Sequence, residues 1–348
     1  MVEIQDTTKK AETTYDIGLG ITSRCNARCK HCYSSSLGRQ EDISLDLIQN
    51  LLSIIPVKSI NLGTGEVGLH PCFEQIIEYI LSNVSKVSIT SNGLTLSRMS
   101  DDQLCRLHDV DISLDFPSAK KHDEFRGVRL FDLAIYQIDR CKKLGVKCSV
   151  ATAVTSANIP YLLEMLSLVR TYDIALRLNL YKQVDAEYLT PNYEQFWNFF
   201  KVFFKYAKIV SCSEPILQVV LGMCHKEFQG SPCTHNSLRI RPNGQISRCV
   251  YLSGEENLYA LEDHHILEKL NHIGHPKYIP VVCHRCKHVN YCQGGCESRR
   301  ILTQGINMPD MYCPFIHGEN IYIEPLIAEK DDSEDYIHSS YLCTLIVK

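Results

Sequence analysis

The chain has 348 residues, of which 45% are hydrophobic and 22% are charged, a balance that excludes a disordered protein and leaves room for more than one core. A formal net charge of −4 gives no sign of a nucleic-acid or acidic-membrane partner, and we expect neither. Met1–Lys10 is polar, without the apolar stretch of a secretory signal, and no run reaches the roughly 18 to 20 apolar residues of a membrane helix. We therefore expect a cytoplasmic protein.

Cysteine is the most informative residue type in this composition, because the chain contains 17 of them. In a reducing compartment, dense cysteine rarely forms disulfides. It serves instead as a metal or cluster ligand, as a catalytic group or as a buried thiol. The spacing of the cysteines therefore decides between these roles.

From about Tyr15 to Gln183, short apolar strands alternate with longer helical patterns, which predicts βα units around a parallel sheet. The expected strands are, in chain order, Ile17–Ile21, Ser59–Leu62, Lys86–Thr90, Val110–Leu114, Lys147–Ala153 and Ala175–Leu180. The expected helices are Ser44–Ile55, Phe73–Val84, Ser100–Leu107, Phe131–Leu144 and Tyr161–Tyr172, with a start signal at Asp42–Ile43–Ser44 and a stop signal at Gly145. Six repeats in about 170 residues favour an open barrel over a closed eightfold one. We expect an α/β fold with a partial (β/α)6, TIM-like barrel and a cysteine-rich C-terminal domain.

The second half of the chain differs from the first in its sequence pattern and composition. Tyr193–Leu221 predicts one or two amphipathic helices that bridge to a second domain. In Cys224–Cys313, frequent glycine, proline and cysteine separate short segments with few apolar residues, so we expect bound metal ions or clusters to stabilise this region. The last residues include an acidic stretch, Glu329–Asp335, and an apolar run, Tyr341–Val347. We divide the chain into an N-terminal extension (1–14), the partial barrel (15–192), bridging helices (193–223), an auxiliary domain (224–325) and a C-terminal tail (326–348).

Cys25, Cys29 and Cys32 follow directly on the first expected strand with the spacing CxxxCxxC. Three thiolates can hold three irons of a [4Fe–4S] cube and leave the fourth iron open, unlike the four-cysteine pattern of electron carriers. An open iron can be chelated by the amino and carboxylate groups of a cofactor's methionine. The alternative is a zinc loop, in which His31 supplies the fourth ligand.

Polar motifs stand at the ends of the next expected strands. They are Asn61-Leu-Gly63-Thr64-Gly65-Glu66, Thr90-Ser91-Asn92-Gly93 and Ser113-Leu-Asp115, followed by His122-Asp-Glu-Phe-Arg126-Gly127. Ligands bind at the carboxyl ends of such strands, so the order of the motifs indicates one common site. Glycines let backbone carbonyls approach a ligand, and Glu66 can accept hydrogen bonds from an ammonium group. Taken singly, these residues fit equally well as turn residues, helix caps or surface charges.

Together with the cysteine triad, these motifs resemble the radical S-adenosylmethionine (radical SAM) superfamily from about Asp16 to Cys313. Val67 stands where that family commonly has proline. The resemblance implies that a [4Fe–4S] cluster on the triad cleaves S-adenosylmethionine, and that the resulting 5′-deoxyadenosyl radical takes hydrogen from a substrate carbon. It also implies cofactor contacts for Tyr33 at the adenine, for Gly63, Gly65 and Glu66 at the amino group, for Asn92, Ser113 and Asp115 at the ribose and carboxylate, and for Arg126 at the carboxylate.

A second set of cysteines resembles the SPASM extension of radical SAM enzymes. Its members are Cys233, Cys249 (five residues after Gly244), Cys283, Cys286, Cys292, Cys296 and Cys313. The resemblance implies two auxiliary [4Fe–4S] clusters, one on Cys233, Cys249 and Cys296 and the other on Cys283, Cys286, Cys292 and Cys313. For the missing fourth ligand of the first, Cys224 is the nearest candidate and Cys212 a poorer one, and without either the open iron could bind substrate. A pair of zinc sites is the alternative for this set.

The remaining cysteines have no ligand spacing: Cys72, Cys105, Cys141, Cys148 and Cys343. Of these, Cys105, Cys141 and Cys148 sit in apolar patterns and are expected to be buried thiols.

The resemblance implies an oxidoreductase-type enzyme of natural product biosynthesis, which modifies a ribosomally made peptide or protein. The same chemistry on a small molecule, a sugar or nucleoside in antibiotic assembly, is the alternative. An iron–sulfur electron carrier or redox sensor is another, but it would not need the Gly63–Glu66 turn. Only 24 residues precede Cys25, so we expect peptide recognition by a separate protein, and electrons from a flavodoxin- or ferredoxin-type donor. No residue is assigned as catalytic.

Overall fold

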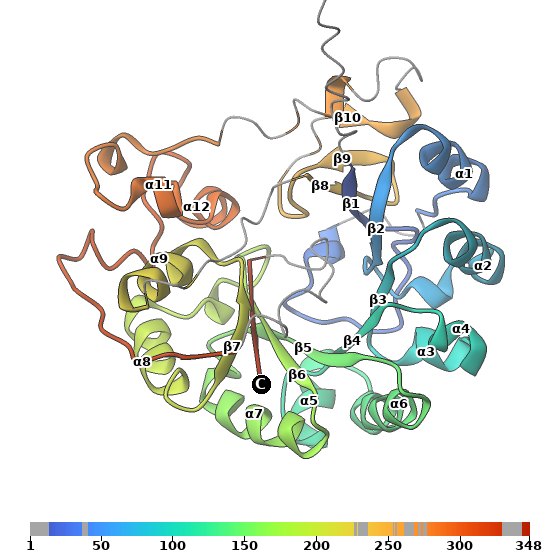
Figure 1. The fold of residues 1–348 in the computed structure, drawn as a ribbon, viewed down its shortest axis with the longest axis horizontal. Coiled ribbons are helices and arrows are strands. Elements are labelled where there is room, and N and C mark those ends of the chain that lie inside the picture. Colours follow the sequence, from blue (N-terminus) through green and yellow to red (C-terminus); the bar gives the residue numbers. More distant parts are fainter. Residues whose placement is uncertain are drawn as a thin grey trace, which may run out of the picture.

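The computed structural model describes residues 14–36, 41–225, 228, 236–252, 254, 256–260, 268–270, 273, 277–328 and 343–348. Most of the expected N-terminal extension, the acidic stretch Glu329–Asp335 and Cys233 lie outside these residues. Within them, twelve strands form one sheet in the order β10-β9-β8-β1-β2-β3-β4-β5-β6-β12-β7-β11. Figure 1 shows the sheet curving around a central space, with helices on its outer side. No helix in the described ranges is long and apolar enough to span a membrane.

The first half of the chain forms six parallel strands with their connecting helices. The strands are β1 (Tyr15–Leu19), β2 (Val57–Leu62), β3 (Val87–Ser91), β4 (Asp109–Ser113), β5 (Cys148–Val154) and β6 (Ala175–Leu180). The helices are α1 (Leu45–Ile54), α2 (Phe73–Asn83), α3 (Leu94–Arg98), α4 (Asp101–Cys105), α5 (Ala119–Arg126), α6 (Phe131–Leu144) and α7 (Leu162–Thr171). Short 3-10 helices cover Tyr33–Ser36, Val67–Leu69, Ile159–Tyr161, Glu187–Leu189, Leu258–Ala260 and Val281–Cys283. All six expected strands are present close to their expected ends, so the predicted partial barrel is confirmed.

Local signals explain where these helices begin and end. The hydroxyl of Ser44 accepts a hydrogen bond from the Leu47 amide at 3.2 Å and so caps α1. Ser100 and Gln103 form a reciprocal capping box at the start of α4. Gly145 ends α6 with a φ of +70°, where a side chain would be strained. The start at Ser44 and the stop at Gly145 are therefore as predicted.

The two helices expected in the bridging segment are present, but this segment and the C-terminal tail also contribute strands that the sequence analysis did not predict. Between α8 (Tyr193–Phe203) and α9 (Pro215–Cys224) runs a strand, β7 (Lys208–Cys212). From the tail, β11 (Leu326–Ile327) pairs with β7, and β12 (Thr344–Val347) lies antiparallel between β6 and β7. A five-residue strand between two strong helical patterns leaves little periodicity of its own. The apolar end of the chain becomes a strand because the gap between β6 and β7 buries all four of its residues.

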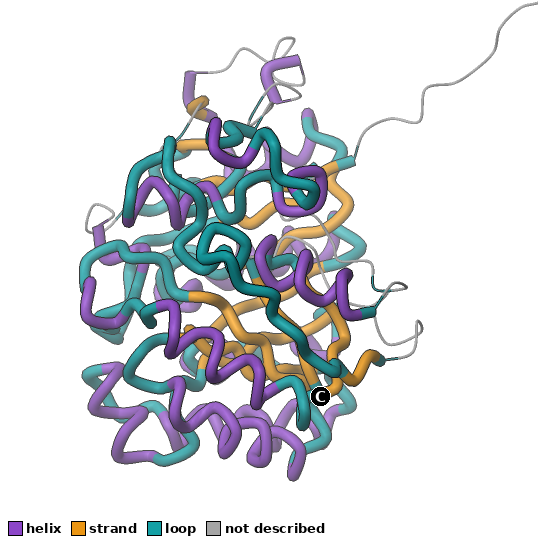
Figure 2. Tube along the Cα trace, turned by 90° about the vertical axis from the view of Figure 1, so that its left-hand side faces the viewer, coloured by secondary structure: helices purple, strands orange, loops and turns teal. Residues whose placement is uncertain are grey.

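The cysteine-rich segment extends the barrel sheet and packs on its last helices. Its elements are β8 (Ser237–Ile240), β9 (Gln245–Ser247), β10 (Glu256–Asn257), α11 (Val289–Cys292) and α12 (Glu297–Thr303), with β8 parallel to β1. The buried guanidinium of Arg299 forms ion pairs with Glu214 at 2.6 Å and Asp310 at 2.5 Å. Tyr312 stacks on Phe196, with ring centroids 3.9 Å apart. Figure 2 views the molecule from this side, where loops predominate around the short helices.

Candidate active site and cluster sites

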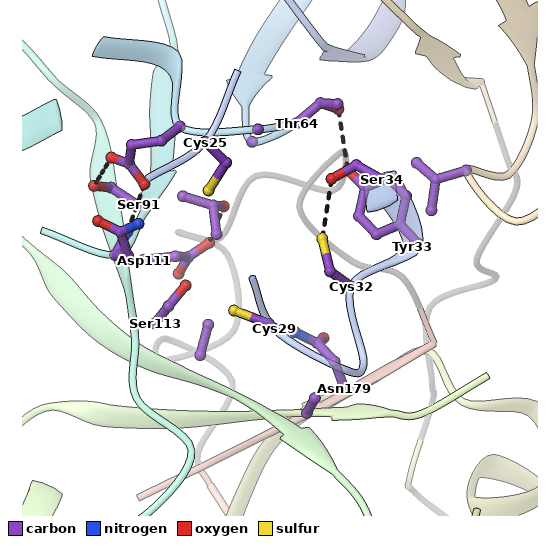
Figure 3. Close-up of a pocket in the computed structure, with 18 of the residues that line it drawn as sticks. Cys25, Cys29, Cys32, Tyr33, Ser34, Thr64, Ser91, Asp111, Ser113 and Asn179 are labelled. Atoms are coloured by element: carbon purple, nitrogen blue, oxygen red, sulfur yellow. Dashed lines mark hydrogen bonds between the residues drawn. The ribbon is translucent and has the colours of Figure 1, made fainter. Parts of the chain in front are cut away.

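A cavity of about 200 Å³ lies at the carboxyl ends of the parallel strands. Its wall contains most of the residues assigned from the sequence, namely Cys25, Cys29, Cys32, Tyr33, Gly63, Gly65, Glu66, Asn92, Ser113 and Arg126. Asp115 is not in the wall but is fully buried and bonded to Arg126. Figure 3 shows the sulfur atoms of Cys25, Cys29 and Cys32 facing the same space. The structure thus brings the cysteine triad and the strand-end motifs together.

The loop that carries the three cysteines is tied to two neighbouring elements. The side-chain amide of Asn92, at the end of β3, donates to the side-chain oxygen of Asn26 at 2.8 Å. The backbone amide of Arg28 donates to the carbonyl oxygen of Arg126, at the end of α5, at 3.2 Å. These contacts fix the loop between Cys25 and Cys29 against the rim of the sheet.

The turn after β2 lies directly against the same loop. The amide of Glu66 donates to the carbonyl oxygen of Arg24 at 2.8 Å. Gly65 has a φ of +64°, and a Cβ there would lie 2.6 Å from the carbonyl oxygens of Thr22 and Arg24. Only glycine fits this approach, so the sequence pattern has a steric cause.

The carboxylate of Glu66 is buried and accepts four hydrogen bonds from the protein itself. The donors are the Ser91 hydroxyl at 2.5 Å, the Asn92 amide at 3.0 Å, the Thr95 amide at 2.8 Å and the Thr95 hydroxyl. The carboxylate therefore joins the β2 turn to the start of α3. Its predicted contact with a cofactor ammonium stays a prediction, and the structure adds this internal role.

Asp115 and Arg126 form a buried ion pair beside the cysteine loop. Nε and Nη2 of Arg126 donate to the same Asp115 oxygen at 2.7 and 2.6 Å. The other oxygen accepts from the Ala153 amide at 3.1 Å. Burial raises the pKa of Asp115, but Arg126, the two neighbouring histidines and the Ala153 hydrogen bond together outweigh burial and hold that pKa below its ordinary value. The pair thus presents a fixed guanidinium to the cavity wall, suited to a carboxylate ligand.

Two further side chains of the loop, both partly buried, are uncharged at neutral pH. Burial lowers the pKa of His31 to about 4 and raises the pKa of Tyr33 to about 12. His31 stacks on Phe125, with centroids 4.9 Å apart, and the Tyr33 hydroxyl bonds the Thr64 hydroxyl at 3.0 Å. Both rings therefore serve as uncharged walls of the loop.

The arrangement of the triad fits a cube better than a single ion. In the described part of the chain, no three His, Cys, Asp or Glu side chains converge on one point as ligands of one metal. Zinc gathers its ligands about one ion, whereas each cysteine of a [4Fe–4S] cube binds a different iron. Three thiols around a shared space, with a glycine cradle beside them, are consistent with the cube.

Several wall residues escaped the sequence analysis, among them Asp111, Arg177 and Asn179. Arg177 is buried and forms ion pairs with Asp109 at 3.0 Å and Asp111 at 2.8 Å. Burial raises the pKa of Asp111 to about 6, although Arg177 opposes the rise. One sequence signal could have identified these wall residues: polar side chains stand at every second position of two otherwise apolar strands, β4 and β6.

A second cavity, of about 280 Å³, lies in the cysteine-rich segment. Its wall contains Cys283, Cys286, Cys292 and Cys313, the four cysteines that the SPASM resemblance assigns to one auxiliary cluster. Two of these cysteines are held in one turn, because the backbone amide of Cys286 donates a hydrogen bond to the carbonyl oxygen of Cys283 at 3.0 Å. Four thiols around one cavity are the ligand set of a closed cluster.

The other auxiliary set is described only in part, because Cys233 lies outside the described residues. Cys249 and Cys296 interact electrostatically. The sulfur of Cys296 lies 3.5 Å from that of Cys343, which has no ligand spacing in the sequence. Cys224, the predicted fourth ligand, instead has its sulfur 3.9 Å from the carbonyl oxygen of Ile321.

The expectation of buried thiols holds for two of three cysteines. Cys141 and Cys148 are buried, but Cys105 is exposed, and that prediction is wrong. Cys105 is the last residue of the short helix α4, and its apolar neighbour Leu104 fills the core position.

Comparison with known proteins finds a family match in the first half of the chain. Residues 19–169 match the radical SAM superfamily. The mycofactocin maturase MftC of Mycobacterium tuberculosis is 31% identical over 169 residues, which are 45% of this chain and 42% of the maturase. The AdoMet-dependent heme synthase of Oleidesulfovibrio alaskensis is 24% identical over 83% of this chain and 84% of that protein. The crystal structure of SuiB from Streptococcus suis bound to S-adenosylmethionine has a TM-score of 0.66 at 15% identity, and the match covers 87% of this chain and 75% of SuiB.

Fold, site and comparisons agree on the class. Residues 19–169, less than half of the chain, match the radical SAM superfamily, whose members use a [4Fe–4S] cluster and S-adenosylmethionine. The SuiB likeness shows the fold alone, and the chain spans less than half the length of the mycofactocin maturases that it matches.

Proposed function

We propose that this protein is a radical SAM enzyme of the SPASM type, which cleaves S-adenosylmethionine reductively and oxidises a substrate after hydrogen abstraction. The observation that carries the proposal is the single cavity in which the cysteine triad meets the strand-end motifs. When bound at Cys25, Cys29 and Cys32, the cluster supplies the electron that cleaves the sulfonium to methionine and a 5′-deoxyadenosyl radical.

The side chains of the cavity have separate tasks in this proposal. The Arg126 guanidinium, fixed by Asp115, would bind the methionine carboxylate, and the carbonyls of the Gly63–Gly65 turn would accept from the amino group. Tyr33 would contact the adenine, and Asn92 and Ser113 would bind the ribose; all three residues belong to the cavity wall. Glu66 keeps the β2 turn and the start of α3 in register. The protein thereby aims the radical at one carbon.

For the substrate we propose a ribosomally made peptide or protein. One relative is named a maturase of mycofactocin, and SuiB has also been crystallised with its precursor peptide SuiA. The second candidate is a small molecule, because the relative that matches most of this chain is named a heme synthase. A flavodoxin- or ferredoxin-type donor would supply electrons in the cytoplasm, where thiols stay reduced.

The test is release of 5′-deoxyadenosine by anaerobically reconstituted, reduced protein supplied with S-adenosylmethionine. We define the loop-cysteine variant as the triple substitution Cys25→Ala, Cys29→Ala and Cys32→Ala. The parent is expected to release 5′-deoxyadenosine slowly and the loop-cysteine variant none. Cys105→Ala, at an exposed cysteine on α4, is the matched control and should behave as the parent. Equal release by the parent and the loop-cysteine variant would refute the proposal.

A further inference from the structure

The C-terminal strand brings a cysteine to the first auxiliary set. Cys343 immediately precedes β12, is buried, and has its sulfur 3.5 Å from the sulfur of Cys296. In the sequence it stands 47 residues beyond Cys296 and has no partner at ligand spacing. The structure alone therefore reveals the proximity.

Two neighbouring side chains show that this group of thiols has a common environment. Tyr251 stands two residues after Cys249, and the centroid of its ring lies 5.6 Å from the buried ammonium of Lys182. Burial lowers the pKa of Lys182, but Cys296, Cys343 and other neighbouring groups outweigh it and raise that pKa. A buried cation beside thiols compensates the negative charge that a thiolate-bound cluster brings.

The position of Cys343 is imposed by the strand that follows it. The Thr344 amide donates to the Ser213 hydroxyl at 3.0 Å, and its hydroxyl bonds the Asn179 side chain at 2.5 Å. Cys343 itself has a φ of +53°, a conformation that a non-glycine residue rarely adopts. Such strain persists where surrounding contacts determine the backbone, and it is concentrated at functional sites.

The other candidates for this role have different partners. The Cys212 thiol donates to the carbonyl oxygen of Glu214 at 3.7 Å. Cys224 ends α9 beside Ile321, as described above. Within the part of the chain that the structure describes, Cys343 is the one of the three in direct sulfur contact with a cysteine of the first auxiliary set.

We infer that Cys343 is a thiolate ligand of the first auxiliary [4Fe–4S] cluster, together with Cys249 and Cys296. This inference rests on the proposed function, because it assumes that the cluster is present. Cys343 would then be the fourth ligand, which the SPASM motif itself does not supply. Assembly of this cluster would therefore depend on the position of β12. Without a cluster, the two thiols form a hydrogen bond, in which Cys343 donates to Cys296 at 3.5 Å; this distance is far longer than the S–S bond of about 2.05 Å, so the contact is not a disulfide.

The experiment uses the full-length loop-cysteine variant, which keeps only the auxiliary clusters, at about eight irons per chain. Cys343→Ala, Cys343→Ser and Cys224→Ala are each added to it. Iron content and the electron paramagnetic resonance spectrum of the reduced protein are measured after anaerobic reconstitution, with circular dichroism to verify folding. Cys343→Ala is expected to lose between one and four irons and to alter one of the two auxiliary signals. Cys343→Ser, which keeps an oxygen ligand, is expected to retain more iron with a shifted signal, and Cys224→Ala is expected to match its parent.

Each other result overturns the inference. It fails if both Cys343 variants keep the parent's iron content and spectrum, or if Cys224→Ala causes the loss instead. It also fails if the iron-loaded parent proves to contain a Cys296–Cys343 disulfide by peptide mapping. If Cys343→Ala does not fold, the spectrum of Cys343→Ser decides. A parent that binds zinc and no iron would instead refute the proposed function, so the two failures are distinguishable.

Discussion

Replacing Glu66 by alanine removes the acceptor of four buried hydrogen bonds. Two of the donors, the amides of Asn92 and Thr95, are backbone groups that cannot turn away, whereas the hydroxyls of Ser91 and Thr95 can. A buried donor without a partner costs about 1–3 kcal/mol, so the two amides together cost about 2–6 kcal/mol. Because Glu66 borders the cavity, water can enter after the substitution and replace some of the lost hydrogen bonds. We therefore expect a cost in the lower half of this range, about 2–4 kcal/mol.

Hydrogen exchange at the two amides measures this loss directly. A loss of about 2–4 kcal/mol accelerates exchange through local opening by roughly 30-fold to nearly 1,000-fold, because each 1.4 kcal/mol is a factor of ten. The measurement is made by mass spectrometry on a peptide that spans residues 91–98. Glu78→Ala is the matched control, since Glu78 is an exposed glutamate whose ion pair with Arg106 is solvated.

The reasoning is refuted if the 91–98 peptide exchanges in Glu66→Ala as slowly as it does in Glu78→Ala. Binding of S-adenosylmethionine to the same variant gives an independent result. If Glu66 also contacts the cofactor ammonium, affinity should fall by roughly 1.5–3 kcal/mol in addition. Unchanged affinity with faster exchange would leave Glu66 with its internal role alone.

Three further predictions follow from the ion pair and the cysteine sets. The reconstituted parent should hold about twelve irons. The loop-cysteine variant should lose one third of them and keep the electron paramagnetic resonance signals of the two auxiliary clusters. Zinc in place of iron would contradict this prediction. Asp115→Asn should lower the free energy of unfolding by about 3–5 kcal/mol, because it leaves Arg126 buried and uncompensated. Since the folded pKa of Asp115 lies below its ordinary 3.8, the stability it contributes is fully present above about pH 4 and is lost as the pH falls through the folded pKa. In denaturant titrations, the difference in free energy of unfolding between parent and variant should therefore be smaller at pH 3 than at pH 7. Cys286→Ala should lower soluble yield and expose residues 277–328 to protease, whereas the loop-cysteine variant stays folded; equal protease resistance would count against it.

The sequence predicts the barrel well because its strands obey a strong pattern. Each strand has apolar residues at alternate positions, and signals such as Ser44 and Gly145 mark where the helices between the strands begin and end. The pattern fails where an element is short and its partner distant. β7 has five residues, and β12 acquires its place only because β6 and β7 leave a gap that matches four residues at the other end of the chain.

The same contrast holds for the sites. Cys25, Cys29 and Cys32 are recognisable because one loop carries all three, so spacing in sequence reflects spacing in space. The set around Cys283 is likewise local except for its last member. Cys343 is invisible to spacing, since its contact with Cys296 depends on the register of an antiparallel strand rather than on a turn.

The position of Tyr251 connects the two halves of the proposed chemistry. Its ring meets the edge of Tyr33 at 5.6 Å between centroids, and both side chains belong to the wall of the cavity. Cys249 directly precedes Val250 and Tyr251, which both belong to that wall. Cys249 of the first auxiliary set therefore lies beside the cavity where hydrogen abstraction is proposed. A cluster so placed is suited to accept the second electron from a substrate radical, which favours net oxidation or bond formation over rearrangement.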